Sequence, residues 1–196
     1  RWYYTTFHLG SGPLWFVEVL LIFSLLYAAG RTWAGRVPAV RRESGRVPGL
    51  AVILVFAVVL GILSFVVRLR FPVNWAFGPL NLQLAFFVQY VALFIAGVVA
   101  YRRNWPARLP NAMLAPSLAT VGLLILVAMP LLLALGGGLN GRTGPYLGGW
   151  HWQALAYAVW EQALAMTMIV SLLIVFRERL NRQSALAREA SAGSYT

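Results

Sequence analysis

Residues 49–67 form a run that contains only Gly, Ala, Val, Leu, Ile, Phe and one Ser, without a single charge. As a helix, such a run is about 28 Å long, close to the ~30 Å thickness of the hydrocarbon core of a bilayer. In lipid a single span must satisfy its own backbone hydrogen bonds, which favours a membrane-crossing helix over a strand. Similar apolar runs occur at about 14–30, 81–101, 112–135 and 152–176.

The composition of the 196 residues agrees with a membrane protein. Hydrophobic residues make up 60% of the chain and charged residues 11%, against roughly 25% charged residues in soluble domains. The absence of Cys excludes disulfides and Cys-based sites. No cluster of metal ligands stands out, and we expect no metal and no tightly bound cofactor.

The basic charge is distributed in a way that predicts the orientation in the membrane. All 16 cations are Arg, and they lie between the apolar runs, which favours a membrane surface over nucleic acid as the partner. With about five spans, twelve of these Arg fall on one side and four on the other. We therefore predict an all-α bundle of about five transmembrane helices within residues 1–180, with the amino end outside and residues 181–196 as a flexible cytoplasmic tail.

Polar residues concentrate in the outer halves of the predicted spans. Glu18 lies roughly 6 Å and Glu161 roughly 13 Å from the outer ends of their helices. Carboxyl and amide groups at such depth are costly without partners. We therefore expect a polar cavity open to the outside, in which Glu18 and Glu161 can pair with cations at the end of the second span. The candidate substrate-binding residues are Trp15, Glu18, Arg68, Arg70, Gln83, Gln89 and Glu161.

Four of these residues also have a purely structural interpretation. Glu18 is close enough to the interface for its carboxylate to reach water. Glu161 can form a structural salt bridge, and the two Gln can serve as hydrogen bonds between helices. Small residues on or near the face of Glu161, at Ala154, Ala158 and Ala165, predict close helix packing around it.

Three stretches resemble the membrane acyltransferase type 3 family. Residues 11–21 are similar to its "G-x-L-W-F-L-x-x-L-L" signature, and residues 65–73 to its next external segment. Residues 82–84 and 89–105 resemble its "Y-x-x-x-F-x-x-G-x-x-A-x-R-x-x-W" stretch. The resemblance extends from about residue 7 to residue 180.

The resemblance implies an enzyme of the bacterial cytoplasmic (inner) membrane. Such an enzyme takes an acyl group from acyl-CoA and transfers it to a hydroxyl of an extracytoplasmic glycan or similar acceptor, as in O-acetylation. The His and Arg proposed as catalytic in that family belong to helices nearer the amino end and have no match here. We therefore expect this chain to be the carboxyl-terminal half, inactive without its amino-terminal half, and the catalytic residues to lie outside it.

Two other functions fit the same pattern of residues. A transporter or flippase-like bundle would use central acids to bind a substrate or a proton, and Pro130 with the following glycines can mark a broken helix. A membrane scaffold would have no chemistry of its own. The polar residues alone do not separate these functions from acyl transfer.

Overall fold

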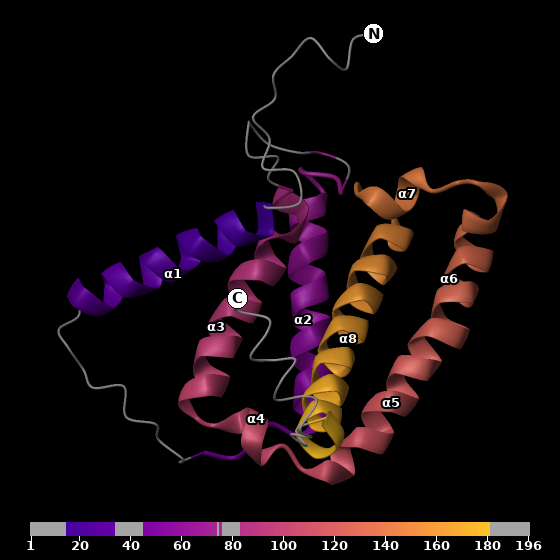
Figure 1. Cartoon of the computed structure of the whole chain (residues 1–196). Helices are drawn as coiled ribbons and strands as arrows, with labels where there is room; N and C mark the ends of the chain where they lie inside the picture. The colour runs from indigo at the N-terminus through magenta and orange to yellow at the C-terminus, as the bar shows by residue number, and fades with distance from the viewer. Residues whose placement is uncertain (1–14, 34–44, 74, 76–82, 181–196) are drawn as a thin grey trace, which may run out of the picture.

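The computed structural model describes residues 15–33, 45–73, 75 and 83–180, and these residues form helices and turns without a strand (Figure 1). The long helices are α1 (Trp15–Trp33), α2 (Leu50–Arg68), α3 (Phe87–Arg102), α5 (Leu114–Leu123), α6 (Met129–Gly136) and α8 (Trp152–Val175). Two short helices, α4 (Trp105–Arg108) and α7 (Gly144–Leu147), lie within connections expected to be loops. The predicted tail at 181–196 lies outside the described residues.

Four helical stretches in the described part of the chain are long and apolar enough to cross a membrane. They are Leu50–Arg68, Leu84–Arg102, Asn111–Gly136 and Trp152–Arg179. The predicted all-helical membrane architecture is thus confirmed in its coarse form, and four of the predicted spans agree with these helices to within a few residues. The fifth span, at 14–30, coincides with α1 and stays a prediction.

The core of the bundle is the antiparallel contact between α2 and α8, which lie side by side in Figure 1. The buried residues of α2 recur every three or four positions and therefore form one face of the helix. At Gly61 a Cβ atom would lie 2.6 Å from the Cα of Val159. Only Gly allows the backbones to approach this closely, as in other tightly packed membrane helices. The buried face of α2 consists of Ile53, Ala57, Leu60, Gly61, Ser64 and Arg68.

The fourth predicted span is a single helical path that changes its winding in the middle. A π-helical segment, Leu124–Ala128, joins α5 to α6 just before Pro130. Proline lacks an N–H group and its ring clashes with the preceding turn. Pro130 therefore explains why the helix widens to a π-helix just before it. The Leu124 carbonyl also accepts a hydrogen bond from Trp160 Nε1 at 2.8 Å, which ties the π segment to α8.

Helix α1 diverges from the other helices in Figure 1 and contacts the bundle through α3. The ring of Phe23 lies 5.5 Å from that of Phe94 between centroids, and Arg102 Nη2 donates to the Tyr27 hydroxyl at 2.8 Å. Much of the remaining surface of α1 is exposed and apolar. This pattern is expected of a helix that faces lipid or another membrane segment.

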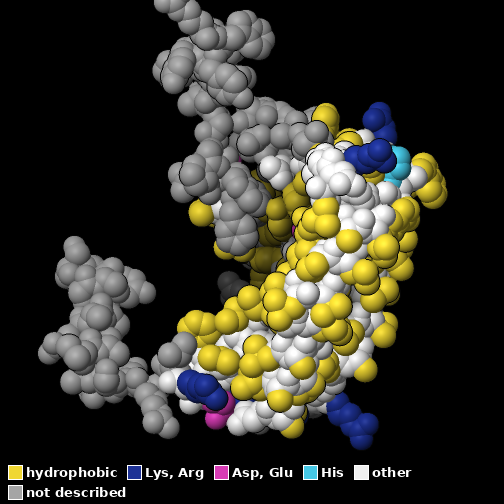
Figure 2. Space-filling model, turned by 90° about the vertical axis from the view of Figure 1, so that its right-hand side faces the viewer, with side chains coloured by type: hydrophobic (Ala, Val, Ile, Leu, Met, Phe, Trp, Pro, Cys, Tyr) yellow, Lys and Arg dark blue, Asp and Glu magenta, His cyan; other side chains and the backbone are white. Residues whose placement is uncertain are grey.

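The described Arg side chains gather at the two ends of the bundle, with apolar side chains between them (Figure 2). We call the end formed by residues 45–49, 102–110 and 176–180 the Arg-rich end, and the end formed by residues 69–75 and 137–151 the opposite end. Such a distribution is the one that a membrane-spanning bundle requires. The Arg-rich end carries Arg46, Arg102, Arg103, Arg108, Arg177 and Arg179, and the opposite end carries Arg70 and Arg142. Arg31 lies in the last turn of α1, and Arg68, the last residue of α2, is buried inside the bundle.

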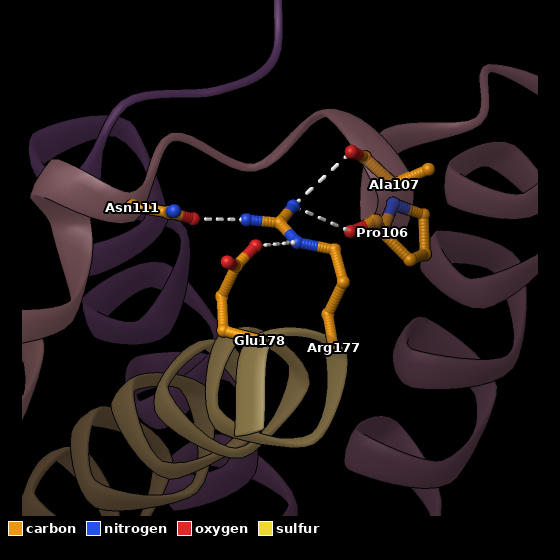
Figure 3. A network of polar contacts seen from close by, with 5 residues as sticks. All are labelled: Pro106, Ala107, Asn111, Arg177 and Glu178. Atoms are coloured by element: carbon orange, nitrogen blue, oxygen red, sulfur yellow. Dashed lines mark hydrogen bonds and ion pairs between the residues drawn. The ribbon is translucent and has the colours of Figure 1, made fainter. Parts of the chain in front are cut away.

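A polar network closes the Arg-rich end (Figure 3). Arg177, which follows α8, donates through Nη1 to the carbonyls of Pro106 and Ala107 at 3.1 Å each. Its Nη2 donates to Asn111 Oδ1, and its Nε pairs with Glu178 at 2.9 Å. A single guanidinium thus fixes α4 and the start of the fourth span to the end of α8, because it satisfies several acceptors at once.

Candidate functional site

The strongest polar feature of the described residues is an ion pair between α2 and α8. Nη2 of Arg68 donates to Oε2 of Glu161 at 2.6 Å. The Arg68 side chain is 0% exposed and that of Glu161 is 22% exposed. The long Arg side chain reaches along the bundle from the last residue of α2, where a cation also complements the helix dipole. The pairing therefore makes the burial of both charges tolerable.

Arg68 is also held by aromatic rings. Its guanidinium carbon lies 5.1 Å from the centroid of Phe86 and 5.9 Å from that of Tyr157. Contacts of this kind favour a desolvated cation. The Nε and Nη1 atoms are nevertheless buried without a hydrogen-bond partner. Because buried polar groups in native proteins are normally satisfied, these two donors would gain from a hydrogen-bonding ligand or water.

A second polar contact lies next to the ion pair and joins α8 to α3. Nε2 of Gln162 donates to Oε1 of Gln89 at 3.0 Å. Gln162 is 1% exposed, and its Oε1 acceptor has no partner. The ring of Tyr90 stacks on that of Phe86, with centroids 6.3 Å apart. The site therefore offers unused donors on Arg68 and an unused acceptor on Gln162.

Two loops cover the site at the opposite end of the bundle. A Cβ atom on Gly148 would lie 2.5 Å from the Arg68 carbonyl oxygen and 3.2 Å from the Cα of Pro72. The N–H of Gly149 donates to the same Arg68 carbonyl at 3.3 Å. The glycines thus let the loop before α8 satisfy the C-terminal carbonyl of α2, which has no acceptor role within its own helix.

The structure brings together only part of the predicted set. Arg68 pairs with Glu161, as expected for one of the two Arg at this end, and Gln89 joins the adjacent contact. Arg70 is exposed, and its guanidinium lies over the ring of Phe71 at 5.8 Å. Its place beyond the end of α2 directs it to the surface.

The other predicted residues do not join the ion pair by any described contact. Gln83 precedes the turn Leu84–Phe86, and its carbonyl accepts the N–H of Phe86 at 3.1 Å. Glu18 lies on α1, and within the described residues its Oε2 is buried without a hydrogen-bond partner. Trp15 begins α1, and its side chain lies outside the described part of the structure.

Sequence reasoning missed Gln162, although a signal for it exists. Ala154, Ala158 and Gln162 are spaced by four residues and therefore lie on one helical face. All three are buried. Of the predicted small residues, Ala154 and Ala158 are buried and Ala165 is half-buried, and Gln162 is buried one turn beyond Ala158.

No protein-family model, curated protein or solved structure shows a significant match to the chain. Within the described residues no group of three or more His, Cys, Asp or Glu can hold a metal ion. The unused Arg68 donors suit a neutral acceptor such as a hydroxyl compound, because Glu161 already balances the charge of Arg68.

Proposed function

We propose that the chain is the carboxyl-terminal membrane part of an acyltransferase that transfers an acyl group from acyl-CoA to a hydroxyl of an extracytoplasmic glycan or similar acceptor. The proposal rests on the resemblance of residues 11–21, 65–73 and 89–105 to the membrane acyltransferase type 3 family. The structural observation that supports it is the buried Arg68, which is paired with Glu161 and retains two unpartnered donors.

In this proposal Arg68, Glu161 and Gln162 position the acceptor and do not react themselves. A sugar hydroxyl can accept from Nε or Nη1 of Arg68 and donate to Oε1 of Gln162. Holding an acceptor in one orientation speeds a transfer reaction, because the entropic cost of aligning the acceptor is met when it binds. Aromatic rings such as Tyr90 and Tyr157 provide apolar surface for a sugar ring.

The deciding experiment is Glu161→Ala in the full-length protein. We expect acyl transfer per amount of protein in the membrane, followed as acylated product by mass spectrometry, to fall at least tenfold. Glu178→Ala is the matched control, because it removes an ion-paired acid at the Arg-rich end. Normal product formation by Glu161→Ala at normal membrane levels would refute a positioning role for the ion pair.

The proposed orientation places the candidate site on the outer side of the membrane. Asn140 lies between α6 and α7 at the same end as Arg68, in a chain without Cys. We expect Asn140→Cys to react with a membrane-impermeant thiol reagent added to intact cells. Arg108→Cys, at the Arg-rich end, should react only after permeabilisation. The reverse pattern would overturn the orientation and the external site.

A transporter is the second candidate, and the π-helical segment favours it. Broken helices commonly surround the substrate site of transporters, and at Leu124–Ala128 the fourth span changes its winding where it bonds to Trp160. If the protein is a transporter, the wild type moves a solute and forms no acylated product. Glu161→Ala would then abolish the movement of that solute. The product assay therefore separates the two candidates.

A further inference from the structure

An apolar groove lies between α2 and α3. One cavity of 460 Å³ and a neighbouring one of 380 Å³ share five lining residues. Cavities of this size are typical of small-molecule sites. The shared residues come from α2, α3, α4 and α8 and from the segment before α2. They are Pro48, Ile53, Ala96, Trp105 and Met166.

The groove continues along α3. A third cavity of 520 Å³, lined by residues from Phe87 to Ile95 on α3, shares Phe56, Ala92 and Ile95 with the first. The first two cavities, which reach the Arg-rich end, are lined by α3 from Ala92 to Tyr101, which gives this part of the groove a length of about 14 Å along the helix. That length is close to half of the ~30 Å hydrocarbon core, which is the depth of one leaflet. Helix α3 itself has no fully buried residue, so the packing around it leaves this space open.

Positive charge and one unused donor lie where the groove meets the Arg-rich end. The guanidinium of Arg103 is 5.7 Å from the ring centroid of Trp105, which lines two of the cavities. Nε1 of Trp105 is buried without a partner. Arg108 donates to the Gly45 carbonyl at 3.1 Å beside them. Among the described acids only Glu178 lies at this end, and Arg177 pairs with it.

We infer that the groove binds an anionic phospholipid of the bilayer, in the leaflet at the Arg-rich end. One acyl chain lies in the apolar groove, since burial of each CH₂ group is favourable. The ester carbonyl accepts from Trp105 Nε1, and the phosphate group lies by Arg103. Basic residues at a membrane surface attract anionic headgroups in this way. The lipid is a resident ligand, distinct from the reacting acyl donor of the proposed function.

The test is native mass spectrometry of the protein after incubation with phosphatidylglycerol or phosphatidylcholine of the same chain length. We expect the wild type to retain phosphatidylglycerol preferentially. Arg103→Gln should weaken this binding about fivefold, as for the loss of one basic residue near an anionic surface. Arg142→Gln, a matched change at the opposite end, should leave it unchanged.

Filling the groove tests the chain-binding part of the inference. Ala96→Trp should abolish retention of phosphatidylglycerol, whereas Ala119→Trp, on an exposed position of α5, should not. Circular dichroism melting shows whether each variant is folded. If Ala96→Trp does not fold, Arg103→Gln still tests the inference. Equal binding of both lipids, binding unaffected by Arg103→Gln, or displacement of the lipid by acyl-CoA would overturn it. None of these outcomes depends on acyl transfer.

Discussion

Glu161→Leu is expected to lower the free energy of unfolding by about 3–5 kcal/mol, as found when one partner of a buried ion pair is removed. The substitution leaves Arg68, which is 0% exposed, with no acid beside its guanidinium. Arg68→Met should cost less. Its remaining partner, the 22% exposed Glu161 side chain, can recover part of its hydration.

The double variant Arg68→Met/Glu161→Leu should be more stable than Glu161→Leu alone. Replacing both charges by apolar groups removes the desolvation cost together with the attraction, and such replacements are often neutral. The free energy of unfolding of the three variants is measured by reversible unfolding in detergent micelles. The coupling energy between the two side chains follows from the double-mutant cycle. Additive effects of the single changes would show that the two side chains do not act as a pair.

The same variants separate a structural role from a functional one. If the ion pair only stabilises the bundle, the folded double variant should retain acyl transfer. If Arg68 positions the acceptor, the double variant should fold and still lose activity, because Met offers no donor to a hydroxyl. Stability and activity thus move together in the first case and separately in the second.

The sequence was sufficient to predict the helices because their apolar runs are long and their ends are marked by Arg and Pro. The second span, predicted at 49–67, is α2 at Leu50–Arg68. The last, predicted at 152–176, is α8 at Trp152–Val175. In lipid the backbone has almost no alternative to a helix over such a run, so length and composition suffice.

The sequence could not decide which Arg pairs with Glu161. Arg68 and Arg70 are two residues apart and would point in different directions on a continuous helix. Helix α2 ends at Arg68, with Leu69 as its cap, and the position of this end decides which guanidinium is buried. The carbonyl at that end accepts the N–H of Gly149, which is far away in the sequence.

Of the polar residues grouped by depth, those of α2, α3 and α8 make the described contacts with one another, and no described contact joins Glu18 of α1 to them. Depth along a helix follows from residue number, whereas the direction in which a helix faces depends on packing. Glu18 was expected in the same polar group as Glu161, but α1 contacts the bundle through Phe23 and Tyr27. The faces of this apolar run are nearly equally hydrophobic. The sequence therefore does not indicate which face of α1 contacts α3.

Gly148→Ala is expected to disturb the candidate site from outside it. The added Cβ would lie 2.5 Å from the Arg68 carbonyl oxygen and 3.2 Å from the Cα of Pro72, and neither backbone atom can rotate aside. The loop must therefore move and weaken the Gly149 N–H bond to the Arg68 carbonyl. Overpacking of this kind typically costs about 1–3 kcal/mol.

The measurement for this loop is hydrogen exchange, combined with thermal unfolding in micelles. Exchange should become faster at 69–73 and 147–151, the two segments joined by the Val73–Leu147 and Arg68–Gly149 hydrogen bonds. Gly144→Ala is the matched control, because no atom lies within 4 Å of the added methyl group. If both variants exchange like the wild type, the loop is not what holds the end of α2 in place. If only Gly148→Ala exchanges faster, and acyl transfer falls with it, the orientation of Arg68 depends on the carbonyl contact made by this loop.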